Sequence, residues 1–169
     1  MRGDRALEAR SRSYSWSDPF LVVEAGATAS GLEVLQRIVR RELPPPPIAE
    51  TLAFELVEVE AGRAVFAGAP AEFHYNPIGV VHAGYTVTLL DSAMGCAFIT
   101  TVEAGARWTT LDLQTSFTRA LTVDTGRVTC TGTVLHRGRR VSTTEARLVD
   151  GQGRLCAHAT STILVLGSA

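Results

Sequence analysis

The sequence predicts an α+β protein in which a curved antiparallel sheet wraps around one long central helix. The first observation is an apolar run over residues 83–102, in which Asp91 is the single charged residue. The second is that residues 108–166 contain four runs rich in Thr, Val and Leu, separated by short turn-like segments. An apolar helix must be covered on most sides, and a strongly curved sheet can cover it.

The N-terminal part of the chain predicts an arm followed by one extra helix. Residues 1–27 are mixed and polar, so we expect a flexible arm that turnover does not require. Ser30 and Glu33 then form a capping box, and apolar residues recur at helical spacing up to a run of prolines. We therefore expect an N-terminal helix with its Pro-rich stop over residues 28–47, and a single domain over 48–169.

Six strands are expected around the central helix, two before it and four after it. Residues 51–60 and 63–69 indicate a hairpin, because Ala61 and Gly62 join them as a turn. The four later strands are expected at residues 108–119, 126–136, 139–149 and 154–166.

Composition narrows the classes of function. The chain of 169 residues is 46% apolar, which favours one folded domain, and its net charge of −1 provides no field for nucleic acid or an anionic membrane. The three cysteines are widely spaced and odd in number, which favours reduced thiols in the cytoplasm over a metal site. The first ten residues also lack the apolar core of a secretion signal. We expect a cytoplasmic protein without a nucleic-acid or membrane partner.

Several polar residues occur at the spacing of a known family. Asn76, His82, Gly84 and Asp91 stand in the pattern Asn-x5-His-x-Gly-x6-Asp. The further matching elements are Thr110-x-Asp112, Phe117-x-Arg119 and Gly138-Arg139-Arg140. Over roughly residues 50–166 the chain resembles the PaaI-type hotdog-fold acyl-CoA thioesterases. The resemblance implies a hotdog fold, a homodimer or a homotetramer of two dimers, and hydrolysis of an acyl-CoA thioester without metal or cofactor.

Two positions depart from the family pattern. Ala83 stands where the second residue of the usual His-Gly-Gly is Gly, and Ala120 replaces a common Pro. The resemblance assigns the oxyanion contact to the N–H of Ala83, and this N–H survives the change from Gly to Ala. Backbone N–H groups at a helix start suit this task, because they are unpaired and carry partial positive charge. The alternative is that residues 82–84 only form a tight entry to a packed helix.

Asp91 is the candidate catalytic carboxylate. A carboxylate on a helix with almost no polar face is costly unless something uses it. It would act as the general base or as the nucleophile, and its apolar neighbours should raise its pKa. The alternative is a structural Asp bonded to Ser92 or to a hydroxyl on a strand.

The spacing of His82 and Asp91 predicts a composite site. Nine residues on a helix correspond to a rise of roughly 13 Å and an angular offset of about half a turn. One carbonyl cannot lie about 3 Å from the helix start and also beside Asp91 of the same helix. Two antiparallel helices related by a two-fold axis solve this problem. The resemblance agrees: Asn76, His82 and Ala83 come from one subunit, and Asp91 and Thr110 from the other.

The remaining candidates have structural alternatives. Asn76 precedes a proline and is a common turn starter, whereas by resemblance its side-chain amide orients the water or the thioester. His82 is assigned the orientation of the loop, and Gly84 a part in substrate binding. By resemblance Thr110 bonds Asp91 or the water. Strand alternation instead places Thr109 on the face of the neighbouring leucines.

Substrate contacts are less well defined. Arg137, Arg139 and Arg140 flank a turn glycine and suit CoA phosphates, although a solvated turn explains them as well. Tyr85, Met94 and Phe98 are candidates for an acyl pocket. The alternative functions are a hotdog hydratase or dehydratase, and a non-catalytic acyl-CoA-binding sensor, which would have no use for Asp91.

Overall fold

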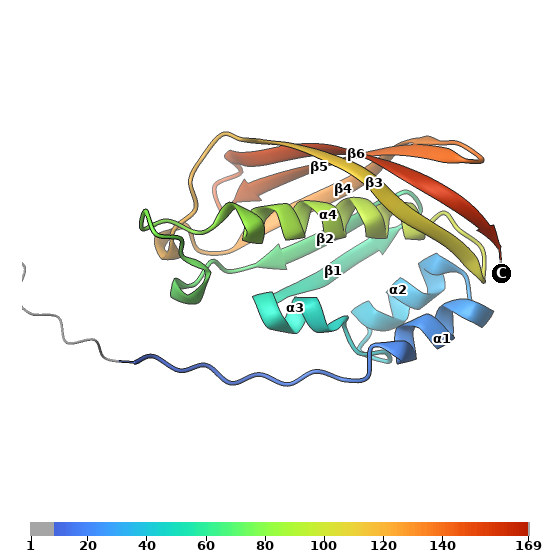
Figure 1. The fold of residues 1–169 in the computed structure, drawn as a ribbon, viewed down its shortest axis with the longest axis horizontal. Coiled ribbons are helices and arrows are strands. Elements are labelled where there is room, and N and C mark those ends of the chain that lie inside the picture. Colours follow the sequence, from blue (N-terminus) through green and yellow to red (C-terminus); the bar gives the residue numbers. More distant parts are fainter. Residues whose placement is uncertain (1–8, 169) are drawn as a thin grey trace, which may run out of the picture.

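The computed structural model describes residues 9–168 and confirms the predicted architecture. A six-stranded antiparallel sheet curves around the central helix α4 (Ala83–Ile99), as Figure 1 shows. The strand order in the sheet is β1-β2-β4-β5-β6-β3. The strands are β1 (Phe54–Glu60), β2 (Arg63–Gly68), β3 (Ala106–Phe117), β4 (Val128–Arg137), β5 (Val141–Asp150) and β6 (Leu155–Ser168). Each lies within a few residues of its expected position.

Helix α4 forms the centre of the core. Leu89, Leu90, Ala93 and Phe98 on this helix are completely buried, and they lie on different sides of it because the sheet covers most of its circumference. Strand β4 passes close to the helix at Gly132, where an added Cβ would lie 2.2 Å from the Ala93 carbonyl oxygen. The sheet therefore holds α4 in one position along its length.

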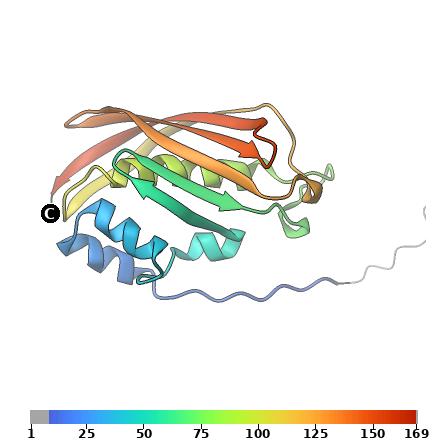
Figure 2. The ribbon, with the colours of Figure 1, turned by 180° about the vertical axis from the view of Figure 1, so that it is seen from behind.

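The N-terminal region contains more structure than the sequence predicts. Helix α1 (Phe20–Thr28) begins within the expected arm and ends one residue beyond it, and α2 (Gly31–Val39) follows it with the predicted Ser30 cap. Both helices lie on the β1 side of the molecule, as the reverse view in Figure 2 shows. Helix α1 has no buried residue, which explains why no apolar stripe marks it in the sequence. The first eight residues of the predicted arm lie outside the described residues.

The third N-terminal helix corrects two expectations. Helix α3 (Pro47–Leu52) begins at the proline that was expected to be part of a helix stop. Proline is compatible with this position, because the first turn of a helix leaves its N–H groups unpaired. The helix also occupies residues 51 and 52, which were expected to open strand β1.

Two short segments connect the sheet to the start of α4. The 3-10 helix η1 (Glu72–His74) follows β2, and a loop over residues 75–82 leads from it to α4. A second 3-10 helix, η2 (Val123–Thr125), lies between β3 and β4. Strand β3 is an edge strand, and within the described chain its only partner is β6.

Candidate active site

Asn76 organises the 75–82 loop through its side-chain oxygen. Its Oδ1 accepts hydrogen bonds from the backbone N–H groups of Ile78 (3.0 Å) and Val80 (3.2 Å). Both partners are donors, which identifies the accepting atom as oxygen and leaves the NH2 group without a hydrogen-bond partner among the described residues. Gly79 completes the turn at φ +82°, a conformation that favours glycine. Asn76 is thus a turn residue that keeps two donors free.

At the start of α4, one backbone N–H group is bonded to the N-cap residue and another has no partner. His82 is the N-cap, and its Nδ1 accepts a hydrogen bond of 2.8 Å from the N–H of Gly84. A Cβ on Gly84 would lie 2.9 Å from this nitrogen, so glycine provides room for the ring. The N–H of Ala83 has no hydrogen-bond partner within residues 9–168. The N–H that the family resemblance selected is therefore the one that remains available.

A small pocket of about 310 Å³ opens beside this helix start. Its wall includes Asn76, Ala83 and Thr86 from the loop and helix, and residues 117–121 after β3. Thr86 lies one turn beyond Ala83 and therefore on the same helix face. The sequence analysis did not select Thr86, although its i+3 spacing from Ala83 was a usable signal. Asn76 and Ala83, which carry the free N–H donors, thus line a common space with two hydroxyl-bearing residues, Thr86 and Thr118.

Asp91 lies in the middle of α4, and its side chain is exposed on the described chain. Partial desolvation of the carboxylate nevertheless raises its pKa above the ordinary value, and a side-chain hydrogen bond with Thr110 partly offsets this effect by lowering the pKa. The hydroxyl partner is on a strand, as the structural alternative expected. The same contact joins the two residues that the resemblance placed on one side of a composite site.

A β-bulge brings Thr110 to the helix-facing side of β3. The register between β3 and β6 shifts between Thr110 and Asp112, which leaves Leu111 as the extra residue. Leu111 is 56% exposed, whereas Trp108 and Thr110 are half-buried. The expectation from strict alternation, that Thr109 shares a face with both neighbouring leucines, is therefore wrong. The bulge at Leu111 reverses the order of inward and outward side chains within this strand.

The structure does not bring Asp91 to the helix start of its own chain. Eight residues separate Ala83 from Asp91, which corresponds to about 12 Å of helical rise. Asp91 is absent from the wall of the 310 Å³ pocket. The described chain thus separates the candidate residues into two groups, one around Ala83 and one around Asp91, which we call half-sites.

The three candidate arginines lie at the opposite end of α4. Arg137 donates a hydrogen bond of 3.1 Å to the Thr101 hydroxyl and stacks its guanidinium 4.8 Å from the centre of the Phe98 ring. These contacts give Arg137 a structural role. Arg139 and Arg140 are exposed in the hairpin between β4 and β5.

The three residues suggested for an acyl pocket are core residues. Tyr85, Met94 and Phe98 are at most 3% exposed, and none of them lines the pocket beside Ala83. The Tyr85 ring packs against His74 and that of Phe98 against Trp108. This suggestion is wrong for the described chain, because the curved sheet encloses the helix faces that carry these side chains.

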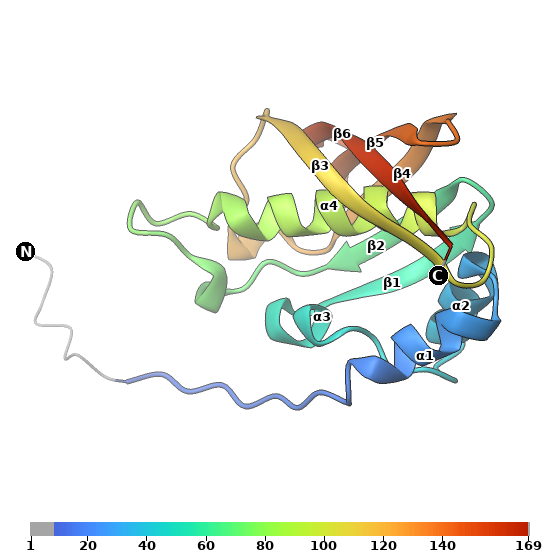
Figure 3. The ribbon, with the colours of Figure 1, turned by 45° about the vertical axis from the view of Figure 1, so that its right-hand side comes forward.

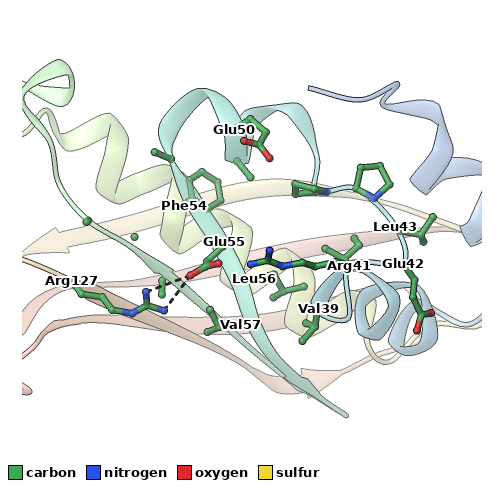
Figure 4. A pocket seen from close by; sticks show the side chains of 18 residues that line it. Val39, Arg41, Glu42, Leu43, Glu50, Phe54, Glu55, Leu56, Val57 and Arg127 are labelled. Atoms are coloured by element: carbon green, nitrogen blue, oxygen red, sulfur yellow. Dashed lines mark hydrogen bonds and ion pairs between the residues drawn. The ribbon is translucent and has the colours of Figure 1, made fainter. Parts of the chain in front are cut away.

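A larger cavity of about 930 Å³ lies elsewhere, between the N-terminal helices and β1. Figure 4 shows its wall, which includes Arg41 and the ion pair between Arg127 and Glu55, whose charged atoms are 3.4 Å apart. None of the predicted site residues lines this cavity. Its volume alone does not make it the site of thioester chemistry.

Other features of residues 9–168 bear on the expected chemistry. No cluster of three or more His, Cys, Asp or Glu side chains in this range has the arrangement of a metal site. The three cysteines, Cys96, Cys130 and Cys156, are free thiols. None of the helices in this range is both long and apolar enough to cross a membrane.

Comparison with known proteins gives the same fold and a family of thioesterases. The family model for the thioesterase superfamily matches residues 78–157. A 1,4-dihydroxy-2-naphthoyl-CoA hydrolase from Listeria monocytogenes is 26% identical over 118 residues, which cover 70% of this chain and 94% of the relative.

Solved structures extend the likeness over most of the chain. A putative thioesterase from Ralstonia eutropha, described as a phenylacetic acid degradation-related protein, is 31% identical with a TM-score of 0.70, over 78% of this chain and 98% of that one. A point mutant of the phenylacetic acid degradation protein PaaI from Thermus thermophilus is 29% identical with a TM-score of 0.64, over 71% of this chain and 99% of that one. A Streptococcus mutans protein solved with acetyl-CoA is 25% identical with a TM-score of 0.62, over 68% of this chain and 90% of that one.

The fold and the comparisons therefore define a hotdog-fold thioesterase of the PaaI type. The chain belongs to the thioesterase superfamily, and it is an enzyme that hydrolyses thioester bonds.

Proposed function

We propose that the protein hydrolyses acyl-CoA thioesters in composite sites, each formed by two copies of the chain. The observation that supports this most directly is the free N–H of Ala83 at the start of α4, beside the free NH2 group of Asn76. A second copy would supply Asp91, which lies too far along α4 to serve the same site within one chain, together with Thr110 on β3.

The proposed reaction begins with attack on the thioester carbonyl carbon. The attacking oxygen belongs to a water molecule whose proton passes to Asp91, or to the Asp91 carboxylate itself. Ala83 donates its N–H to the carbonyl oxygen as that oxygen becomes negative. The C–S bond then breaks, and CoA leaves as a thiolate that takes up a proton. In the carboxylate route, water hydrolyses the resulting anhydride and restores Asp91.

The other residues hold these groups in place. Asn76 would orient the water or the thioester with its free NH2 group, while its oxygen keeps the loop closed. His82 holds Gly84 and so orients the helix start. Arg139 and Arg140, at the far end of α4, are candidates for the CoA phosphates, and we propose no such role for Arg137, which has internal contacts.

For the acyl group we propose an aromatic class. The support is that two similar proteins are named for aromatic compounds, a dihydroxynaphthoyl-CoA hydrolase and a phenylacetic acid degradation-related protein. The proposed oligomer, a dimer or a pair of dimers, follows from the composite site. We further propose that the reaction needs neither metal nor cofactor.

The first experiment is a substrate panel with detection of the free thiol. Purified protein should release CoA from phenylacetyl-CoA or another aryl-CoA faster than from acetyl-CoA or octanoyl-CoA, and treatment with a chelator should leave the rate unchanged. Asp91→Asn keeps the shape of the side chain and removes the base or nucleophile, so it should lower kcat by about 10²-fold or more.

The panel has a clear negative result. If Asp91→Asn folds like the wild type and turns over at the same rate, Asp91 is structural. Complete loss of activity on chelation, with recovery on adding zinc, would instead show that hydrolysis depends on a metal.

A further inference from the structure

The N-terminal arm contacts the fold through Arg12. One guanidinium nitrogen, Nη1, donates to the carbonyl oxygen of Thr51 at 2.7 Å, and Nη2 donates to that of Glu50 at 2.8 Å. Figure 3 shows the arm running past α3 toward the side of the molecule that carries the start of α4. A planar fork that spans two carbonyls fixes both partners, which a single-point charge does not.

These two bonds complete the end of α3. The last carbonyls of a helix have no partner within the helix. His74 Nε2 donates to the Leu52 carbonyl oxygen at 2.9 Å, and the N–H of Ala53 donates to Ala49. Arg12 supplies the donors for the two carbonyls between those of Ala49 and Leu52. The end of α3 is thus held jointly by the arm and by η1.

Arg12 is also the first member of a stack that ends in α4. Its guanidinium lies 4.1 Å from the centre of the Phe73 ring. The Phe73 ring is 4.2 Å from that of His74, and the His74 ring is 4.1 Å from that of Tyr85 in the first turn of α4. The stack joins the arm to the helix start through adjacent rings.

The backbone of η1 makes the same connection. The His74 carbonyl oxygen accepts a hydrogen bond of 2.8 Å from the N–H of His82. His82 is the N-cap that holds Gly84 and immediately precedes Ala83. The backbone of η1 is therefore bonded directly to the residue that precedes Ala83.

We infer that Arg12 is a positioning residue for thioester hydrolysis, which it supports by holding Phe73 and His74 and, through them, the start of α4. The inference rests on the proposed function, because it gives the Ala83 N–H a chemical task. It also opposes the expectation that turnover does not require the arm. Arg12 contacts α3 and Phe73, which support the site, and the structure gives it no contact with the reacting atoms.

The test compares Arg12→Ala, Arg12→Lys and the wild type by steady-state kinetics and by hydrogen exchange of the peptide that covers residues 71–84. Arg12→Ala should lower kcat by about tenfold or more with KM changed less than about twofold, because a displaced donor weakens the transition state. Exchange of the same peptide should accelerate by about fivefold or more, as expected for lost hydrogen bonds. Arg12→Lys should give intermediate values.

The matched control is Arg63→Ala, which removes an arginine bonded to Glu58 and Glu60 on the β1–β2 hairpin. It should leave both kcat and the exchange of residues 71–84 unchanged. The inference is overturned if exchange in Arg12→Ala equals that of the wild type, or if exchange accelerates while kcat stays the same. Should Arg12→Ala fail to fold, Arg12→Lys decides by the same two readouts. Failure of the proposed function is a separate result, a wild-type protein that hydrolyses no acyl-CoA.

Discussion

At the scale of single residues, the surroundings of Asp91 set its pKa and so its strength as a base. Its position on an apolar helix raises its pKa, and Thr110 limits the rise. A base whose pKa is moved toward neutrality accepts a proton more effectively at working pH than an ordinary aspartate does. The nearby Cys96 thiol has its pKa raised to about 12, first by burial and then by the charge of Asp91. This thiol is therefore protonated and a poor competing nucleophile.

His74 makes the stability of the fold depend on pH. Burial lowers its pKa below 6.5, the hydrogen bond to Leu52 raises it in part, and the charge of Arg12 lowers it further. The ring is neutral, since Nδ1 accepts from the Ala71 N–H while Nε2 donates to Leu52. The unfolded chain therefore binds a proton at higher pH than the folded chain. The stability from His74 is complete above about pH 6.5 and is lost as the pH falls below it.

Urea unfolding of the wild type and of His74→Gln would measure how much His74 contributes to the pH dependence of the free energy of unfolding. Between about pH 7.5 and about pH 5.5, the wild type should lose more free energy of unfolding than the variant, with a slope of at most about 1.4 kcal/mol per pH unit. Comparing the two proteins cancels the titration of other groups. Equal pH dependence in both would show that His74 does not take up its proton on unfolding in this range.

At the scale of elements, the start of α4 permits a test of one backbone N–H. Ala83→Pro removes this donor and replaces it with a ring. Proline is compatible with the first helical position, and His82 before it has φ −61° and ψ 137°, which suit a residue that precedes proline. We expect kcat to fall by about 10²- to 10³-fold, the usual cost of a lost oxyanion donor, with little change in melting temperature.

Ala83→Ser is the control for this substitution, because it alters the side chain and keeps the N–H. It should retain most of the activity. A proline variant that is folded and as active as the serine variant would assign the oxyanion contact to another donor.

At the scale of the whole molecule, complementation between two chains tests the composite site. One chain carries Asp91→Asn and the other Asn76→Ala, and the heterodimer is purified through separate tags. If each site takes Asn76 from one chain and Asp91 from the other, both lesions fall in one site and the second site is wild type. The heterodimer should then recover about half of the wild-type activity per dimer.

The two parent homodimers provide the comparison, and each should be nearly inactive. A heterodimer as inactive as its parents would place both residues in one site within a chain. The prediction from the helical spacing would then be wrong, while the assignment to the thioesterase superfamily would be unaffected.

The sequence by itself determined the central helix, the six strands and the family. A long apolar run with a single charged residue and alternating strands are local patterns, and each follows from which faces must be buried. The motif from Asn76 to Asp91 supplied most of the candidate site residues, and Thr110 was selected only through the resemblance. The catalytic roles and the dimer stay predictions.

The tertiary structure alone decided the features that depend on distant contacts. Helix α1 buries no side chain, so the sequence shows no helical periodicity there. Helix α3 is short and begins with a proline, a residue that usually ends helices. The bulge at Leu111 arises where β3 pairs with β6, about 50 residues further along the chain. Arg12 reaches α3 across 38 and 39 residues. Such contacts leave no local pattern, because their partners meet only after the chain has folded around α4.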